Sequence, residues 1–199
     1  MKQITSKDNA KLKLVRQLSS CAKVRHQEEC YVVESKKLVS EFLSRSPELV
    51  KWVLVSEDTE VTLLEAVPIF RLSKTIFRSI QTTQHSQGVL AVVWMNSRQL
   101  DLDGAKRIVI CDGIQNPMNL GAIIRSAVAF GMDGVLLSED CVDVYHPEVI
   151  RASAGTVDLI ACDRLDRREL VGFELFGLNG QAEKSISEVD FSQYEKVGV

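Results

Sequence analysis

Apolar and polar residues follow one another in blocks that predict helices and strands in turn along the first half of the chain. Apolar residues recur at helical spacing over residues 7–27, where Leu12, Val15, Leu18 and Ala22 form one stripe. Shorter blocks predict strands at 31–33, 52–55, 69–72 and 88–94, and helices at 36–43, 61–66 and 74–80. This alternation is typical of a small α/β sandwich, which we expect over residues 1–95.

A polar segment without periodicity, residues 96–106, separates these elements from a second alternating series. It contains the turn signal Asp103-Gly104 and is expected to be a linker. The second series predicts strands at 107–111, 134–137, 157–161 and 173–178, and helices at 120–130, 147–152 and 165–171. Strands separated by helices imply a parallel sheet with covered faces. The last residues, 196–199, resemble the beginning of a further strand.

The charge of the chain is unevenly distributed. The 199 residues are 45% hydrophobic, enough for one large or two small cores, and the net charge is −3. Residues 1–25 nevertheless carry +6, which leaves −9 for the remainder. The basic residues there are Lys2, Lys7, Lys11, Lys13, Arg16, Lys23 and Arg25. They indicate either a contact with a polyanion or a solvated helix face, and the sequence favours neither.

The remaining composition argues against membrane, secreted and metal-binding classes. Five cysteines are scattered without a C-x-x-C pair, as expected for a reducing, cytoplasmic compartment. Three histidines lie far apart, so no metal site is expected. There is no signal peptide, and no apolar run approaches the roughly 18 residues of a membrane span, so no membrane contact is expected.

The segment 108–129 carries the strongest chemical signal. An apolar run at 108–111 is followed by a turn-rich stretch at 112–119 and by a helical pattern from Leu120, with Arg125 in its second turn. In α/β sheets ligands bind at such a junction, and a helix N-terminus favours anions. We expect Asn119 to cap this helix. Arg125 would face a phosphate, or else form a salt bridge on an exposed helix.

Two ordered motifs resemble a known family. Residues 112–155 are similar to the first signature of the SpoU (TrmH-like) RNA 2′-O-ribose methyltransferases of the SPOUT class, close to D-P-x-N-x-G-A-I-I-R-T-A followed by R-A-S-x-G. The matching residues are Asn119, Gly121, Arg125, Arg151, Ser153 and Gly155, whereas Asn116 and Ser126 replace the commoner Asp and Thr. Residues 31–43 and 85–93 resemble the substrate-binding domain of these proteins, with Ser35 where Gly is usual.

The resemblance implies a function and an architecture. It implies an S-adenosylmethionine-dependent methyltransferase of rRNA or tRNA that works as a homodimer. An α/β substrate-binding domain (1–95) and a linker (96–106) would precede a parallel-sheet SPOUT domain with an α/β knot (107–199). The family's second and third signatures, G-x-E-G-x-G and I-P-M…S-L-N-V-S, are absent, so we expect the knot segment to be missing after Val199. The alternative is a non-catalytic RNA-binding protein that cannot bind cofactor.

The resemblance also assigns roles to single residues. Arg125 and Asn119 would be catalytic, and a guanidinium suits phosphate binding and oxyanion stabilisation better than proton abstraction. Leu178, Asn179 and Gly180 would touch the adenosyl group of the cofactor, although Asn-Gly also makes a plain turn. Arg151 would contact RNA, or else pair with Glu148. From the basic N-terminal segment, the expected RNA contacts are Lys7, Lys11, Lys13, Arg16 and Lys23.

The same segment contains two informative glycine patterns. Gly121 permits close approach of the backbone either to a ligand or to another element. The loop has the form G-x-x-x-x-x-N-x-G rather than G-x-G-x-x-G, which argues against a dinucleotide-binding site.

Overall fold

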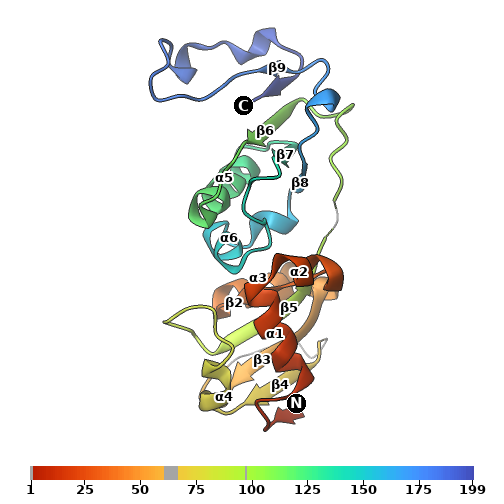
Figure 1. Cartoon of the computed structure of the whole chain (residues 1–199), viewed down its shortest axis with the longest axis vertical. Helices are drawn as coiled ribbons and strands as arrows, with labels where there is room; N and C mark the ends of the chain where they lie inside the picture. Colours follow the sequence, from red (N-terminus) through yellow and green to blue (C-terminus); the bar gives the residue numbers. More distant parts are fainter. Residues whose placement is uncertain (1, 61–66, 97) are drawn as a thin grey trace.

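The computed structural model describes residues 2–60, 67–96 and 98–199, which form two five-stranded sheets arranged along the long axis of the molecule (Figure 1). The first sheet has the order β1-β4-β3-β5-β2. Its strands are β1 (Lys2–Ile4), β2 (Cys30–Glu34), β3 (Val50–Ser56), β4 (Ile69–Leu72) and β5 (Val89–Trp94). β1, β4 and β3 are parallel, whereas β5 runs antiparallel to both β3 and β2.

Helices cover both faces of this first sheet because its strands alternate their apolar side chains. One face packs α1 (Ala10–Ser20) and α4 (Lys74–Arg78) against Val32, Leu54 and Val92. The opposite face packs α3 (Lys36–Arg45) against Val33 and Val53. The predicted α/β sandwich is therefore confirmed.

The second sheet is parallel throughout, with the order β8-β7-β6-β10-β9. Its strands are β6 (Arg107–Cys111), β7 (Gly134–Leu137), β8 (Ala161–Arg164), β9 (Glu174–Leu175) and β10 (Val197–Gly198). Two α-helices, α5 (Pro117–Ala129) and α6 (Pro147–Ala152), connect β6 to β7 and β7 to β8. The mixed α/β class and the parallel sheet are as expected.

Several predicted elements differ from the structure. The helix expected at 7–27 is two helices, α1 and α2 (Ala22–Glu28), which are separated by Cys21 in an extended conformation. The apolar run at 157–161 is buried but forms the 3-10 turn η2 (Thr156–Asp158), and β8 starts only at its end. The remaining short turns are η1 (Pro47–Leu49), η3 (Arg167–Glu169), η4 (Ile186–Glu188) and η5 (Phe191–Gln193).

Two further predictions in the C-terminal part were too long, and one cannot be compared. The helix expected at 165–171 is only η3, and the strand expected at 173–178 is only β9. The helix predicted at 61–66 lies outside the described residues. Within the described ranges, no helix has both the length and the apolar content that a bilayer crossing requires.

The two sheets are held together by contacts between the first domain and the segments on either side of α6. Arg25, which is 2% exposed, lies 2.5 Å from a carboxylate oxygen of Asp143. Arg45 donates to both carboxylate oxygens of the buried Asp158, at 2.7 and 2.9 Å. The rings of Tyr31 and Tyr145 pack against each other at a tilt of 34°, with centroids 4.9 Å apart. These contacts fix the first sheet relative to α6, and through α6 relative to α5.

Candidate active site at the carboxyl edge of the second sheet

The loop after β6 lies at the carboxyl edge of the second sheet and is anchored to the segment after β7. The Gly113 amide donates a hydrogen bond to the Ser138 hydroxyl at 2.9 Å. The Ile114 amide donates to the Cys141 sulfur at 3.3 Å, and that thiol donates to the Cys111 carbonyl at 3.2 Å. Two neighbouring strand ends therefore build one loop, at the edge where α/β sheets bind ligands.

The helix that follows this loop begins three residues earlier than expected. Asn116 is the N-cap residue, because its side-chain oxygen accepts from the amides of Met118 at 2.9 Å and Asn119 at 3.2 Å. Pro117 occupies the first helical position, which its fixed φ suits. The prediction that Asn119 caps the helix was therefore wrong. The Asn-Pro pair was the sequence signal that could have placed the cap correctly.

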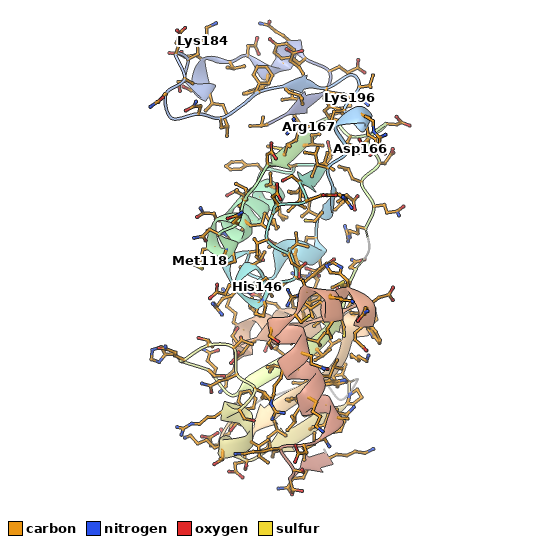
Figure 2. The ribbon with its side chains drawn as sticks, viewed as in Figure 1. Met118, His146, Asp166, Arg167, Lys184 and Lys196 are labelled. Atoms are coloured by element: carbon orange, nitrogen blue, oxygen red, sulfur yellow. The ribbon has the colours of Figure 1, made fainter. Side chains whose placement is uncertain are left out.

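Asn119 and Arg125 are exposed on the outside of α5. With the helix starting at Pro117, Arg125 falls in the third turn rather than the second, about 12 Å along the axis from the first residue. It lies on the same helical stripe as Met118, which is 56% exposed and labelled on the outer side of α5 in Figure 2. Among the described residues, no carboxylate pairs with Arg125, unlike the salt-bridged alternative.

Gly121 faces α6 rather than a ligand. A Cβ added at this residue would lie 2.5 Å from the Ala152 Cβ and 2.8 Å from the Val149 carbonyl oxygen. The two helices therefore approach at a distance that only glycine allows. At the end of α6, the buried Ser153 is the C-cap and Gly155 follows with φ +72°, so these two residues form the helix end and a tight turn.

Arg151 on α6 forms the ion pair that the sequence offered as an alternative. Its guanidinium lies 3.4 Å from a Glu148 carboxylate oxygen, and both side chains are 40–46% exposed. An exposed pair of this kind contributes little to stability and opens easily toward another anion. The structure thus shows the pair but leaves the guanidinium accessible.

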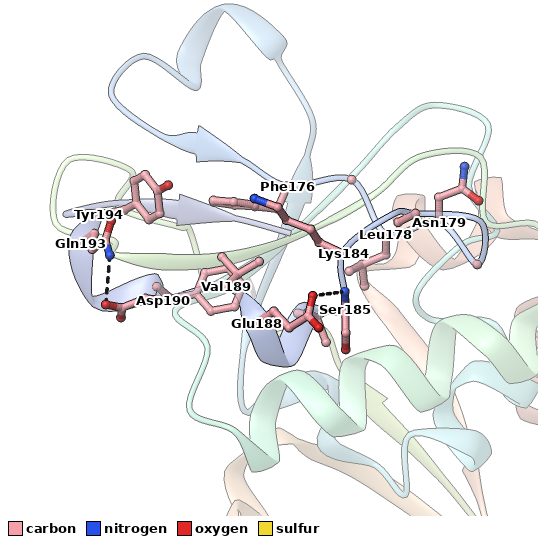
Figure 3. A pocket seen from close by; sticks show the side chains of 15 residues that line it. Phe176, Leu178, Asn179, Lys184, Ser185, Glu188, Val189, Asp190, Gln193 and Tyr194 are labelled. Carbon is pink, nitrogen blue, oxygen red and sulfur yellow. Dashed lines mark hydrogen bonds between the residues drawn. The ribbon is translucent and has the colours of Figure 1, made fainter.

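The segment between β9 and β10 surrounds a cavity of about 890 Å³ that contains the three residues expected to touch the cofactor (Figure 3). Leu178, Asn179 and Gly180 are all exposed, and Leu178 is 70% exposed. Asn179 and Gly180 form a turn, in which the Ala182 amide donates to the Asn179 carbonyl at 3.0 Å. On the other wall, Ser185 and Glu188 form a capping box at η4.

A second, apolar groove of about 980 Å³ adjoins this cavity between α5 and the C-terminal segment. Ala122 and Ala127 line it from α5, and Ile110 lines it from β6. Leu178 lines both the groove and the cavity, so the two form a continuous hollow. No local sequence pattern indicates this groove, because it forms only when distant segments assemble.

Two thiols in the second sheet favour their neutral form. Burial raises the pKa of both the Cys111 and the Cys162 thiol to about 12, which favours the protonated thiol over the nucleophilic thiolate at neutral pH. Burial also lowers the pKa of the His146 side chain. Across the ranges that the structure describes, no group of three or more His, Cys, Asp or Glu side chains could hold a metal ion.

The basic N-terminal residues are not equivalent. Lys7, Lys13 and Lys23 are exposed. The Lys11 ammonium lies over the rings of Trp52 and Phe70, at 5.2 and 4.9 Å from their centroids. Arg16 donates to the Lys7 carbonyl at 3.1 Å and to the Ser79 hydroxyl at 3.2 Å. Arg25 is buried, so it is not part of a basic surface.

Comparison with known proteins identifies two successive domains. Residues 106–197 match the SpoU rRNA Methylase family, and residues 9–91 match the MRM3-like substrate binding domain. The first match contains the loop after β6, α5 and the cavity of Figure 3. The second contains most of the first sheet.

Curated relatives are similar over part of their length. The chain is 32% identical over 158 residues to the 23S rRNA (guanosine(2553)-2′-O)-methyltransferase RlmP of Bacillus subtilis, which covers 78% of this chain and 62% of that protein. It is 39% identical over 94 residues to the 23S rRNA (guanosine-2′-O-)-methyltransferase RlmB of Xanthomonas campestris, covering 44% of this chain and 38% of that protein. The chain thus spans less than two thirds of these relatives.

Solved structures share the fold. An rRNA methyltransferase from Sinorhizobium meliloti superposes with a TM-score of 0.79 at 22% identity, covering 99% of this chain and 80% of that chain. The SpoU methyltransferase AviRb from Streptomyces viridochromogenes, in complex with AdoMet, superposes with a TM-score of 0.76 at 20% identity, covering 96% and 79%. The chain thus carries an MRM3-like substrate binding domain over residues 9–91 and a SpoU rRNA Methylase family domain over residues 106–197, in the order that the two sheets follow.

Proposed function

We propose that this protein is an S-adenosylmethionine-dependent rRNA 2′-O-ribose methyltransferase. The observation that carries the proposal is the position of Arg125. It is an exposed guanidinium without an acidic partner among the described residues, on the helix after the first loop of a SpoU-family domain. The names of the Bacillus and Xanthomonas relatives, both 23S rRNA 2′-O-methyltransferases, support rRNA as the substrate.

Arg125 acts on the substrate in this proposal. A ribose 2′-hydroxyl is a weak nucleophile, so the site has to hold it in line and stabilise negative charge as it develops. The Arg125 guanidinium binds the adjacent phosphate through two donors and stabilises the developing oxyanion. It does not abstract the proton, because a guanidinium offers hydrogen-bond donors and no acceptor. Asn119, exposed one helical turn after the cap, offers an amide to the same backbone.

The hollow beside β9 and β10 fits an adenosyl cofactor. Leu178 provides an exposed apolar wall, and Asn179 has a side-chain amide at the rim. Gly180 has no neighbouring atom within 4 Å of an added Cβ, which leaves its backbone open to a ligand. The cavity volume lies within the range of about 300–1,000 Å³ for small-molecule sites. When bound, S-adenosylmethionine supplies the methyl group, and these three residues hold its adenosyl portion.

RNA contacts, assembly and location complete the proposal. Lys11, Lys13 and Arg16 on α1 and Arg151 on α6 contact phosphates, with Lys7 and Lys23 beside them. The protein acts as a homodimer, as the sequence resemblance implies. Its place of action is the cytoplasm, which the bacterial rRNA-modifying relatives support.

The test measures methyl transfer from radiolabelled S-adenosylmethionine to 23S rRNA by the full chain. Methylation of a ribose 2′-hydroxyl is recognised because the adjacent phosphodiester bond then resists alkaline cleavage. Arg125→Ala is expected to lower kcat about 10²–10³-fold, as for the loss of one oxyanion donor, while the melting temperature stays unchanged. Unchanged turnover would remove Arg125 from the mechanism.

Arg125→Lys is the matched variant, because it keeps the charge but loses the two-donor fork. We expect it to restore RNA affinity without restoring kcat. RNA binding by the wild-type chain without any methyl transfer would instead support the alternative function, a non-catalytic RNA-binding protein.

A further inference from the structure

The first sheet carries a pocket of its own, away from the site described above. It has a volume of about 270 Å³ and lies where β3 and β4 end, between the turn after β3, α4 and the segment before β5. β3 and β4 are parallel, so the pocket is at a carboxyl edge, where α/β sheets place their ligand sites. Figure 1 shows the segment between α4 and β5 projecting from the body of the molecule on the same side as α5.

The pocket has a fixed back wall. Gly88, at φ +74°, brings the chain so close to the turn after β3 that an added Cβ would lie 2.1 Å from the Thr59 hydroxyl. The Gln87 side-chain oxygen accepts from the Lys36 amide at 2.9 Å, which ties the segment to the start of α3. The Gly88 amide donates to the Ser86 hydroxyl at 3.3 Å. The pocket is therefore built by residues from three separate parts of the first domain.

Its lining combines two cations with free amide groups. Lys74 forms an ion pair with Asp58 at 2.8 Å, and the Ser56 hydroxyl also donates to that carboxylate. Arg78, also in the lining, is exposed and has no acidic partner among the described residues. Within the same part of the chain, the side-chain amides of Gln81 and Gln84 form no hydrogen bond. The lining thus retains one unpaired positive charge and two amides.

These groups are those that recognise a nucleotide. A guanidinium binds phosphate, whereas a side-chain amide donates and accepts at the edge of a base. Proteins read RNA sequence mainly from unstacked, single-stranded bases, which a shallow polar pocket can accept. The volume is just below the range of whole small-molecule sites, so it suits one nucleotide rather than a complete cofactor.

We propose that this pocket binds one unstacked nucleotide of the RNA substrate, with Arg78 at the phosphate and Gln81 and Gln84 at the base edge. The inference rests on the proposed function for its ligand class and adds a place where the first domain reads sequence. It differs from the basic residues of α1, where Lys11 and Arg16 are engaged by aromatic rings and by hydrogen-bond acceptors within the chain.

The experiment measures binding of the full chain to fluorescent single-stranded octamers of each base by anisotropy, without S-adenosylmethionine, between 50 and 300 mM salt. Arg78→Gln is expected to reduce the slope of log K against log salt by about 0.7, the contribution of one phosphate contact on a single strand. The control Lys2→Gln removes the same charge at the opposite edge of the sheet and is expected to leave the slope unchanged.

The double variant Gln81→Ala with Gln84→Ala is expected to weaken the preferred octamer about tenfold and to flatten the preference among bases. Its salt slope stays unchanged, because no charge is lost. Gln17→Ala, an exposed amide on α1, is the matched control and should have no effect. Cross-links from a 4-thiouridine octamer are expected to map to residues 74–88.

The proposal is overturned if the double variant Gln81→Ala with Gln84→Ala binds all octamers like the wild type. It is also overturned if the cross-links map outside residues 74–88. Either result with intact methyl transfer leaves the proposed function standing. Pocket-dependent binding without methyl transfer to 23S rRNA would instead overturn the proposed function and leave the pocket assigned.

Discussion

Ser35 holds a backbone conformation that favours glycine, and replacing it tests how much free energy that conformation costs. The residue joins β2 to α3 with φ +137° and ψ 152°, a region populated almost only by glycine. Its hydroxyl accepts from the Leu38 amide at 3.2 Å and caps α3. A Ser35→Gly variant therefore removes strain and a cap at once, and a Ser35→Ala variant removes the cap alone.

The magnitudes separate the two variants. A non-glycine residue in this region costs about 1–3 kcal/mol. Replacing serine by glycine at an N-cap lowers stability by a few tenths of a kcal/mol. The greater conformational entropy of glycine in the unfolded chain lowers stability by about a further 0.4–1 kcal/mol. Ser35→Gly should therefore stabilise the protein by about 1 kcal/mol. Ser35→Ala keeps the strain and loses the cap, so it should destabilise by about 1 kcal/mol.

Thermal unfolding followed by circular dichroism measures both effects. At the size of this chain, 1 kcal/mol corresponds to roughly 2–4 °C, so the glycine variant should melt about 4–8 °C above the alanine variant. Equal losses in the two variants would mean that Ser35 carries no backbone strain and that the cap alone matters. That result would refute the φ assigned to this residue.

Three further predictions follow from the packing and the ion pairs. Gly121→Ala should destabilise the protein by about 1–2 kcal/mol in urea unfolding. Overpacking against α6 costs more than the roughly 1 kcal/mol of helix propensity that alanine gains. A stabilised variant would contradict the close contact between the two helices. Arg45→Ala leaves the buried Asp158 carboxylate unpaired and should lower the free energy of unfolding by about 3 kcal/mol. Adding Asp158→Asn to the same chain should recover part of this loss. An unchanged urea midpoint in Arg45→Ala would contradict the ion pair. Hydrogen bonds from Lys74 and Ser56 lower the pKa of Asp58 to about 2, so its contribution to stability is complete above pH 3.8 and is lost as pH falls toward 2; an NMR titration should show this pKa returning toward 3.8 in Lys74→Gln.

The amino-acid sequence alone determined the class of the fold and the place of the candidate site. The strands β4, β6 and β7 and the helix α6 have the predicted bounds, because the apolar residues of each are closed on both sides by polar or turn-forming residues. The loop after β6 was found for the same reason, since its strand, turn residues and helix are contiguous in the chain. Its family resemblance was likewise carried by contiguous motifs.

Only the tertiary structure decided which partner each buried residue meets. Arg25 belongs by sequence to a basic segment, yet it is buried against Asp143, which lies 118 residues further along the chain. Gly121 could have faced a ligand, but the structure places α6 against it. The apolar pattern at 157–161 correctly predicts burial but not the 3-10 turn that achieves it. Periodicity records that a side chain leaves water, and the identity of its neighbour is set by long-range packing that no local pattern encodes.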